Sequence, residues 1–321
     1  MTDRATETYD VVVAGGGSAG LSGALTLARA RRSVLVIDEG APRNAPAAGV
    51  HGFLSREGIN PMELLRIGRE EVRGYGGRIE SGAVSAARRE GDGFLVTLAD
   101  GREIGARRLL VATGLTDELP DIPGLADRWG RDVLHCPYCH GWEVQDQPLG
   151  ILATGPMAVH QALMFRQWSD DVTLFLHTAP EPNPEEAEQL AARGIDVVRG
   201  EIDAVEVTDD HISGVRLRDG RLIARQALVV APRFTARSGL LASLGIEPSP
   251  HPRGVGEHFE ADPTGLTPVP GVWVAGNVTD LMAWVTAALA AGVMAAAALN
   301  ADLIAEDTRK AVEAHRVPAH A

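Results

Sequence analysis

The segment YDVVVAGGGSAGLSGALTLARARRSVLVIDEG, at 9–40, most constrains the fold. An apolar, β-branched run is followed by a glycine-rich turn, a helical pattern and a second apolar run that ends in an acid. Gly15, Gly17 and Gly20 fit G-x-G-x-x-G, and Asp38 lies where a carboxylate takes up a ribose hydroxyl. The segment therefore predicts a βαβ unit that binds a dinucleotide at the positive end of its helix. The alternative is a glycine-rich turn that binds nothing.

Two later segments predict further strands of the same sheet. RLLVATG is an apolar run that ends in Thr113 and Gly114, and PGVWVAGNVTD contains a second run that stops at Gly276 and Asn277. Ligands bind at the carboxyl ends of parallel strands, so these four residues are expected at the ligand-binding edge.

Residues 148–178 repeat the strand–helix–strand pattern with a less regular turn. We therefore predict an α/β protein with two Rossmann-like domains of the three-layer ββα type, the second inserted in the first. The predicted boundaries place the first domain at 1–117 and 247–321, and the inserted domain at 118–246. A length of 321 residues is more than one ordinary domain usually holds, which agrees with this division.

Composition narrows the environment and the partners. A formal charge of −13 argues against nucleic acid and anionic membranes as partners, because both are negatively charged. Two cysteines in a chain of this length do not suggest a disulfide-stapled secreted protein, and the start MTDRATETYD lacks the layout of a signal peptide. We expect a cytoplasmic globular protein.

The stretch LMAWVTAALAAGVMAAAAL, at 281–299, is uncharged and long enough to span a bilayer. Nine of its residues are alanine, which contributes little transfer free energy, and clusters of Arg or Lys do not flank it. We therefore expect a buried, closely packed helix and no membrane partner.

The two cysteines of the chain, Cys136 and Cys139, lie in the motif HCPYCHGWE. Pro137 fits the first turn of a helix, and a C-x-x-C there lies near the positive helix end, which favours the thiolate of the first cysteine. If the helix continues, Cys136 shares a face with His140, and His135 shares one with Cys139. Each sulfur then has an imidazole within reach, as a redox-active pair would need.

Two other interpretations of this motif remain. The pattern H-C-x-x-C-H suggests zinc, but four ligands within six residues can hardly surround one ion tetrahedrally, and the chain has no further cysteine. We therefore expect no metal site. The second alternative is a pair of buried cysteines with a structural role only.

With these motifs the chain resembles the low-molecular-weight thioredoxin reductases, a type of flavoprotein disulfide oxidoreductase. The resemblance rests on GGGSAG, on ATG at 112–114, on GVWVAGNVTD and, most specifically, on a C-x-x-C just inside the second domain. It covers nearly the whole chain. It implies an enzyme that binds FAD and forms a homodimer, and whose middle domain, in the reductases, binds NADPH.

The middle domain departs from the reductases at its own glycine-rich turn. Here the turn is ATGPMA, with Ala153 at the first glycine position and Pro156 inside the loop, while Gly155 and Ala158 are retained. Alanine does not readily adopt the positive φ of a tight turn, and proline lacks an N–H to donate to a phosphate. After the next strand, APEPNPEE offers no arginine for a 2′-phosphate. This argues against NADPH; a variant turn that binds NADH is the alternative.

A second departure directly follows the cysteines, where the reductases resembled here have an aspartate and this chain has His140. CPYCHGWE is similar to the FAD-dependent dithiol oxidases, which close disulfides in bacterial dithiolopyrrolone and fungal epidithiol natural products and have lost the nicotinamide site. This resemblance implies that Cys139 lies next to the flavin and that a substrate thiolate attacks Cys136. It makes His140 the candidate general base and Glu143 the residue that orients it.

The implied reaction oxidises a small dithiol to an intramolecular disulfide, with electrons passing to FAD and then to O2, which becomes H2O2. The main alternative is an NAD(P)H-dependent thioredoxin-disulfide reductase. A ferredoxin- or flavodoxin-driven reductase and a non-catalytic flavin-binding partner are further alternatives. For His140 the alternative is a helix-capping or simply exposed histidine, and for Glu143 it is a solvated helix charge. The sequence does not identify the dithiol.

The resemblance also assigns residues to FAD. These residues lie at the nucleotide end of FAD, at the ends of strands and at the start of the apolar helix near the flavin. They are Gly15, Gly17, Ser18, Ala19, Gly20, Asp38, Glu39, Thr113, Gly114, Gly276, Asn277 and Val285. Asn277 stands where the family usually has an aspartate. GAPRNAPAAGVHGF occupies the segment that runs beneath the flavin ring in relatives, so Arg43, Asn44 and His51 are further candidates, with exposed loop residues as the alternative.

Overall fold

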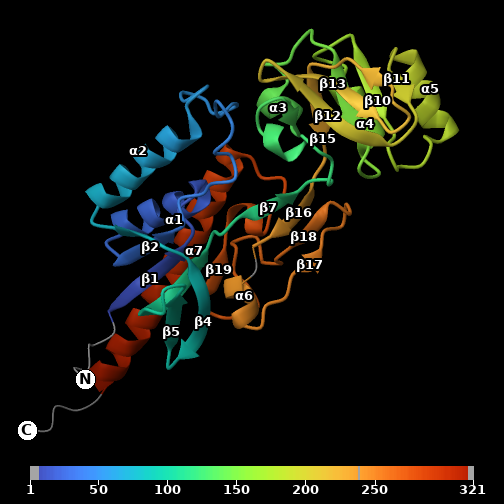
Figure 1. Ribbon diagram of the computed structural model, residues 1–321. Helices are drawn as coiled ribbons and strands as arrows, with labels where there is room; N and C mark the ends of the chain where they lie inside the picture. The colour runs from blue at the N-terminus through green and yellow to red at the C-terminus, as the bar shows by residue number, and fades with distance from the viewer. Residues whose placement is uncertain (1–6, 238, 317–321) are drawn as a thin grey trace, which may run out of the picture. The chain divides into compact units, whose positions relative to one another are not determined.

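The computed structural model describes residues 7–237 and 239–316 (Figure 1). The first six residues, part of the stretch on which the absence of a signal peptide was predicted, lie outside the described residues. The chain divides into two compact units. Unit 1 comprises Met1–Arg43, Met62–Thr116 and Phe234–Ala321, and unit 2 comprises Asn44–Pro61 and Asp117–Arg233.

The predicted α/β class with two Rossmann-like folds is confirmed, but the units divide the chain at other positions than we predicted. Residues 234–246 lie in unit 1, because Leu240 and Leu241 are buried in its core and the Ser243 hydroxyl accepts the N–H of Ala87 at 2.9 Å. Residues 44–61 cluster with unit 2.

Unit 1 is built on a seven-stranded sheet with the strand order β3-β2-β1-β6-β5-β4, and β19 also pairs with β6. The pairs of β1 with β2 and β6, of β2 with β3 and of β19 with β6 are parallel, whereas β4 and β5 are antiparallel additions. The apolar runs of β1 and β2 are buried on both faces, as is typical of parallel strands covered by helices. The strands are β1 (Thr8–Ala14), β2 (Val34–Asp38), β3 (Arg78–Ser81), β4 (Val84–Glu90), β5 (Gly93–Leu98), β6 (Glu103–Val111) and β19 (Val272–Val274).

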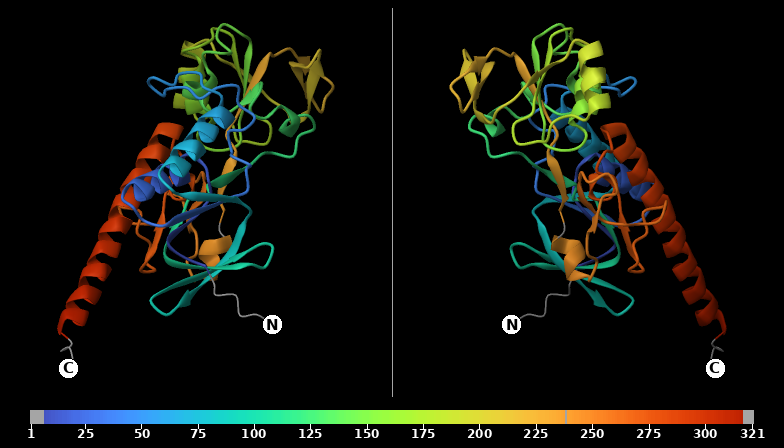
Figure 2. Two further views of the ribbon diagram at one scale, coloured as in Figure 1. Left: turned by 90° about the vertical axis from the view of Figure 1, so that its left-hand side faces the viewer. Right: turned by 90° about the vertical axis from the view of Figure 1, so that its right-hand side faces the viewer.

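Helices α1 (Ser18–Arg29) and α7 (Val285–Arg316) pack against each other over this sheet (Figure 2). Small residues allow the two backbones to approach closely: a Cβ on Gly292 would lie 2.1 Å from the carbonyl oxygen of Ala19. The buried residues of α7 recur at helical spacing and are Ala288, Gly292, Ala295, Ala296, Leu299, Leu303 and Glu306. Unit 1 also contains α2 (Pro61–Gly74), α6 (Gly239–Ser243) and the 3-10 turn Gly276–Val278.

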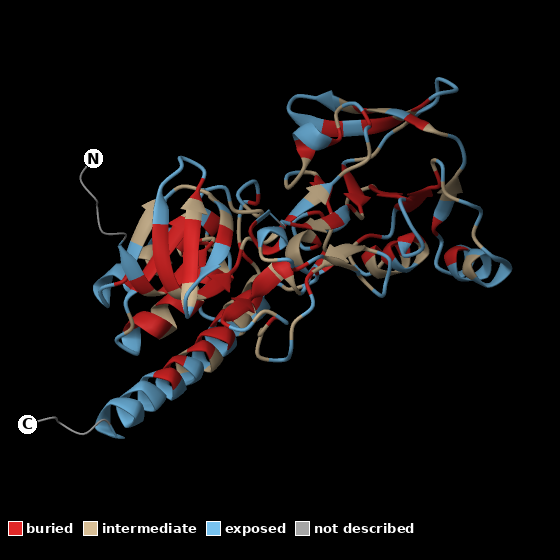
Figure 3. Ribbon diagram, turned by 90° about the horizontal axis from the view of Figure 1, so that it is seen from below, coloured by how far each residue is buried: buried red, intermediate tan, exposed pale blue. Residues whose placement is uncertain are grey.

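By length and composition α7 is able to cross a membrane, but one of its faces is part of the core of unit 1. The predicted close packing holds for that face. The opposite face is exposed, including Val293, Met294 and Ile304, and so are the last turns of the helix (Figure 3). The helix continues well beyond the apolar stretch at 281–299 on which it was predicted.

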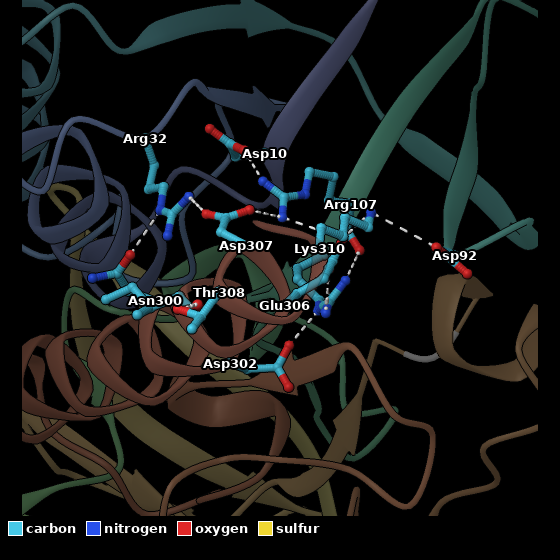
Figure 4. A network of polar contacts seen from close by, with 12 residues as sticks. Asp10, Arg32, Asp92, Arg107, Asn300, Asp302, Glu306, Asp307, Thr308 and Lys310 are labelled. Atoms are coloured by element: carbon cyan, nitrogen blue, oxygen red, sulfur yellow. Dashed lines mark hydrogen bonds and ion pairs between the residues drawn. The ribbon is translucent and has the colours of Figure 1, made fainter. Parts of the chain in front are cut away.

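Ion pairs connect the C-terminal part of α7 to β6, and through Arg107 of β6 the network extends to β1 (Figure 4). The buried Glu306 carboxylate lies 2.7 Å from Arg108 and 3.2 Å from Arg107. Lys310, one turn further along α7, lies 2.5 Å from the same carboxylate, and Arg107 also pairs with Asp10 of β1 at 2.7 Å. Burial opposes the ionisation of Glu306, but the three cations outweigh it and lower the pKa of this carboxyl to about 2.

Unit 2 contains a parallel five-stranded sheet in the order β11-β10-β9-β15-β8 and an antiparallel meander of three strands. Its helix α5 begins at a capping box, in which Asn183 accepts the N–H of Glu186 and the Glu186 carboxylate accepts that of Asn183. The elements are β8 (Val133–Leu134), α3 (Pro137–His140), β9 (Leu149–Leu152), α4 (Ala158–Phe165), β10 (Val172–Phe175), α5 (Pro184–Ala192), β11 (Asp196–Val198), β12 (Ile202–Thr208), β13 (His211–Leu217), β14 (Leu222–Ile223), β15 (Ala227–Val230) and the 3-10 turn Ala126–Arg128.

A four-stranded sheet in the order β17-β18-β16-β7 contains the two strands in which the chain passes between the units. Its strands are β7 (Leu115–Glu118), β16 (Arg233–Ala236), β17 (Ser249–Pro250) and β18 (Gly256–His258).

Candidate active site

The glycine-rich turn between β1 and α1 has the geometry of a phosphate cradle. Gly15 adopts φ +101°, and a Cβ there would lie 2.4 Å from the Ala112 carbonyl oxygen. A Cβ on Gly20 would lie 1.9 Å from the carbonyl oxygen of Gly15, so this position also requires glycine. Gly17, by contrast, has no neighbour within 4 Å of such a Cβ and caps α1 without a side-chain hydrogen bond. The space beside Gly17 at the start of α1 is therefore open, which leaves room for a phosphate at this helix end.

Asp38, at the end of β2, is fixed next to this turn. One carboxylate oxygen accepts the N–H of Gly16 at 3.1 Å, and the other lies 2.8 Å from the guanidinium of Arg69 on α2. An ionised carboxylate can accept about four hydrogen bonds, so Asp38 keeps acceptor capacity for ribose hydroxyls.

The residues after β6 and β2 are joined through Arg237. The Thr113 hydroxyl donates to the Arg237 carbonyl at 3.1 Å, and the Arg237 N–H donates to the carbonyl of Gly114 at 3.0 Å. The Arg237 guanidinium lies 3.5 Å from the carboxylate of Glu39. Thr113, Gly114 and Glu39 therefore lie around one segment of unit 1, as the sequence predicts for residues at one sheet edge.

The loop before α7 supplies a third set of candidates. Gly276 has φ +79°, and a Cβ there would lie 2.9 Å from the Cβ of Ala19, which is buried beside Ser18 in the first turn of α1. The Asn277 amide nitrogen donates to two carbonyls of the loop at 3.0 Å each, which fixes the approach to Val285 at the start of α7. The amide oxygen takes no part in these bonds and is the atom available to a ligand.

The segment 40–53 is divided between the units. Arg43 lies in unit 1, with its guanidinium 5.0 Å from the ring centroid of Phe234. Asn44 and His51 lie in unit 2, where the Asn44 carbonyl accepts the N–H of Ala47 at 3.1 Å. All other predicted FAD residues belong to unit 1.

The cysteine motif forms one helical turn and a following loop. Helix α3 begins at Pro137 as predicted, but it ends at His140. Cys136 is its N-cap residue, and its carbonyl accepts the N–H groups of both Cys139 and His140 at 3.2 Å. Both cysteines are partly buried. The predicted helical face that joins Cys136 and His140 is thus limited to this single turn.

Contacts with α4 and the loop after it hold the motif in place. Gln161 of α4 donates to the carbonyl of His135 at 3.0 Å. A Cβ on Gly141 would lie 2.9 Å from the Trp168 indole, so only glycine fits where the motif passes Trp168. Tyr138 meets the same indole edge to face, with ring centroids 5.8 Å apart.

His140 is one of several partly buried ionisable side chains of this motif. Both ring nitrogens are shielded from solvent, and neither has a hydrogen-bond partner among the described residues. Burial lowers the pKa of the imidazole below 6.5, the charge of Glu143 opposes this shift, and that of His51 adds to it. A neutral imidazole with an unused nitrogen is the form that accepts a proton. His140 is therefore not the exposed histidine that we considered as an alternative.

Glu143 is paired with a histidine from another part of unit 2. Its carboxylate lies 3.4 Å from Nε2 of His51, and Nδ1 of His51 lies 2.7 Å from the Glu57 carboxylate. The side chain of His51 is mostly buried, at 23% exposure, between these two acids.

The turn between β9 and α4 lacks the geometry of the first turn. Unlike Gly15, Ala153 does not adopt a positive φ. The Thr154 hydroxyl donates to the carbonyl of Ala231 at 2.7 Å, which ties it to the neighbouring chain segment. Pro156 supplies no N–H, and α4 starts only after Met157. The second turn therefore offers fewer donors to a pyrophosphate than the first.

The arginine near the position where a 2′-phosphate would be recognised is already paired with a carboxylate. Arg199 directly follows β11, the strand next to β10, and its guanidinium donates two hydrogen bonds of 2.7 Å to Glu181. Glu181 belongs to APEPNPEE, the segment after β10. A phosphate there would have to displace this carboxylate and would be repelled by it.

Sequence reasoning missed the partners that fix the candidate residues. Arg69 on α2, Glu57, Gln161, Trp168 and Arg237 make contacts at long sequence separation or within irregular loops. No local periodicity or motif marks such residues. Among the described residues, no group of three or more His, Cys, Asp or Glu side chains is placed to hold a metal ion.

The chain belongs to the pyridine nucleotide-disulphide oxidoreductase family, whose model matches residues 9–292. It is a flavoprotein disulfide oxidoreductase with a thioredoxin reductase-like fold. Proteins of this family bind FAD, and the glycine turn, Asp38 and the uncapped start of α1 fit that cofactor.

Two curated fungal proteins match the chain over nearly its whole length. Thioredoxin reductase tcpT of Claviceps purpurea is 32% identical over 313 residues, which cover 92% of this chain and 95% of tcpT. Thioredoxin reductase sirT of Leptosphaeria maculans is 29% identical over 317 residues, which cover 93% of this chain and 95% of sirT. The crystal structure of HlmI aligns with a TM-score of 0.90 and 48% identity over 98% of both chains. An oxidoreductase from Agrobacterium tumefaciens aligns with a TM-score of 0.87 and 36% identity over 92% of this chain and 99% of its own.

Proposed function

We propose that the protein is an FAD-dependent dithiol oxidase, which forms an intramolecular disulfide in a small dithiol. The contrast between the two glycine-rich turns supports this proposal most directly. The FAD turn has Gly15 at φ +101°, whereas the corresponding turn of unit 2 has Ala153 without a positive φ and Pro156 without an N–H. An enzyme of this family without a nicotinamide site needs another source of electrons, and a dithiol substrate supplies them.

The first half of the proposed reaction transfers the substrate to the enzyme. His140 accepts a proton from one substrate thiol, and the resulting thiolate attacks the sulfur of Cys136 in the oxidised Cys136–Cys139 pair. The bond between the two cysteine sulfurs breaks, a mixed disulfide forms between the substrate and Cys136, and Cys139 leaves as a thiolate. The neutral, partly buried imidazole of His140 suits this step because one of its nitrogens can take the proton.

The second half releases the product. The other substrate thiol loses its proton and attacks the substrate sulfur of the mixed disulfide, so that the cyclic disulfide leaves and Cys136 becomes a thiolate. The substrate has lost two electrons and two protons, and the enzyme pair is reduced. Bound FAD would take these two electrons from Cys139 and pass them to O2, giving H2O2. As further parts of the proposal, the enzyme is a homodimer in the cytoplasm.

The main alternative is an NAD(P)H-dependent thioredoxin-disulfide reductase. The names of tcpT and sirT favour it. The pairing of Arg199 with Glu181 and the altered turn at Ala153 oppose it.

Peroxide formation from dithiols tests the proposal. We expect the purified yellow protein to consume O2 and produce one H2O2 per disulfide formed when small dithiols are supplied in air. Cys136→Ser and Cys139→Ser should each abolish this turnover without removing bound FAD, because the two sulfurs act as one unit. Peroxide formation by the serine variants at the wild-type rate would reject the proposed role of the cysteine pair.

A further inference from the structure

A small closed loop in unit 2 presents two ionisable side chains to the segment that follows the cysteines. Residues 50–59 close on themselves through a bridge in which the Val50 N–H donates to the carbonyl of Ile59 at 2.8 Å. Gly58 closes the loop further by donating its N–H to the carbonyl of Val50 at 2.9 Å. Backbone hydrogen bonds therefore fix the conformation of this loop.

Inside this loop, His51 and Glu57 are fixed against each other. The Glu57 carboxylate accepts the N–H of Gly52 at 2.9 Å and lies 2.7 Å from Nδ1 of His51. The pKa of Glu57 is lowered, first by its hydrogen bond with His51 and also by the backbone of Gly52. The ring is thus held from one side while its other nitrogen points away from the loop.

The other nitrogen of His51 reaches the cysteine motif. Nε2 lies 3.4 Å from the carboxylate of Glu143, three residues after His140. An ionised carboxylate only accepts hydrogen bonds, so His51 satisfies both acids only when both of its nitrogens carry a proton. In that form the ring is a cation between two anions.

We propose that His51 and Glu57 are positioning residues for the dithiol reaction, which hold the Glu143 carboxylate and balance its charge next to His140. The inference rests on the proposed function, in which His140 is the base. The sequence suggested that His51 contacts FAD. In this inference His51 instead influences proton transfer at His140 in unit 2.

The charges act on His140 in opposite directions. Glu143 favours the protonated ring, and the charge of His51 disfavours it. A base must be unprotonated to act, so the charge of His51 opposes the tendency of Glu143 to hold a proton on His140. The ionisable groups of the two segments around His140 are His135, Cys136, Tyr138, Cys139 and Glu143 on its own segment and His51, Arg56 and Glu57 on the loop.

Titration of His140 in the oxidised, FAD-loaded protein tests the inference. In that state the cysteine sulfurs are joined and do not titrate, and ¹³C-labelled histidine gives an NMR signal that His140→Asn identifies by its loss. We expect His51→Asn and Glu57→Gln to raise the titration midpoint of His140, and Glu143→Gln to lower it. A shift of about half a pH unit or more is expected for His51→Asn and for Glu143→Gln. The acid limb of kcat/KM for dithiothreitol should move in the same directions.

The opposite signs separate this role from a merely structural one. A loosened loop would admit water to His140 and move the midpoint toward its ordinary value, upward, in every variant. A fall with Glu143→Gln and a rise with His51→Asn support the inference, and Glu143→Asp, which keeps the charge, should restore a midpoint near that of the wild type. His211→Asn and Glu188→Gln, at exposed positions of unit 2, serve as matched controls and should leave the midpoint unchanged.

Equal shifts in one direction for His51→Asn and Glu143→Gln, or no shift in either, would overturn the inference. The NMR titration does not depend on turnover, so it separates this inference from the proposed function. Opposed shifts in a protein that oxidises no dithiol would reject the proposed function and leave the electrostatic pairing established. Dithiol oxidation without opposed shifts would reject the pairing alone.

Discussion

An imidazole that is shielded from water resists protonation. For the partly buried His140, this effect should appear in the pH dependence of the reaction. Burial lowers the pKa of His140 below 6.5, so its neutral form persists as the pH falls through that value. We therefore expect the acid limb of kcat/KM for dithiol oxidation to lie below pH 6.5. An exposed histidine acting as base would place this limb at or above its ordinary value.

Replacement of His140 gives the corresponding mutational prediction. His140→Asn should lower kcat/KM by about 10²- to 10⁴-fold, the usual contribution of a general base, and should remove the acid limb of the profile. Stopped-flow turnover of a dithiol across pH measures both effects, with His211→Asn as the control. An unchanged limb in His140→Asn would assign the titration to another group.

At the scale of single residues, the sequence pointed to candidate groups that belong to motifs and did not indicate the residues that contact them. G-x-G-x-x-G and C-x-x-C-H identified Gly15, Cys136 and His140 because their spacing along the chain carries the chemistry. The pairing of His51 with Glu143 spans more than 90 positions, and nothing in either local sequence indicates it. Such contacts are set by tertiary packing.

At the scale of elements, α7 depends on a buried carboxylate for its attachment to the sheet. Glu306 has a pKa of about 2, below its ordinary 4.5, because Lys310, Arg108 and Arg107 together outweigh its burial. A lowered acid pKa stabilises the folded state fully above the unfolded value, and the contribution is lost as the pH falls from about 4.5 toward 2. Acid should therefore weaken the attachment of α7 within that range.

Glu306→Gln tests this attachment directly. The amide keeps the shape but leaves Arg107 and Arg108 without their buried anion, so the free energy of unfolding at neutral pH should fall by about 3 kcal/mol. The variant should also lose part of the acid dependence of stability between pH 4.5 and 2. Urea unfolding across pH measures both, and Glu313→Gln, at an exposed site of α7, is the matched control. Equal acid slopes in Glu306→Gln and the wild type would contradict the assignment.

The uncharged, alanine-rich stretch predicted α7, but not the full length of the helix. The uncharged stretch at 281–299 placed a helix there. The charged residues that follow continue it to Arg316, and ion pairs of Glu306 with Arg107 and Arg108 of β6 attach this part to the sheet. The single turn of α3 shows the reverse case. The helix that begins at Pro137 ends at His140, and the following Gly141 passes close to Trp168.

For the whole molecule, the sequence predicted two Rossmann-like folds, but the compact units divide the chain at other residues. The order of strands and glycine turns along the chain is local information and indicated the class. Residues 44–61 belong to unit 2, and the contact of His51 with Glu143 joins this segment to one far away in the sequence. Boundaries of this kind cannot be read from composition or turn signals.

The central claim is that the flavin receives its electrons from a dithiol through Cys136 and Cys139 and not from a nicotinamide. The flavin absorbance of the purified protein under anaerobic conditions tests it most directly, with NADPH or NADH added first, a small dithiol added next and air admitted last. We predict no bleaching by either nicotinamide, bleaching by the dithiol and full recovery in air. Rapid bleaching by NADPH or NADH, or a flavin that a dithiol leaves oxidised, would contradict the account.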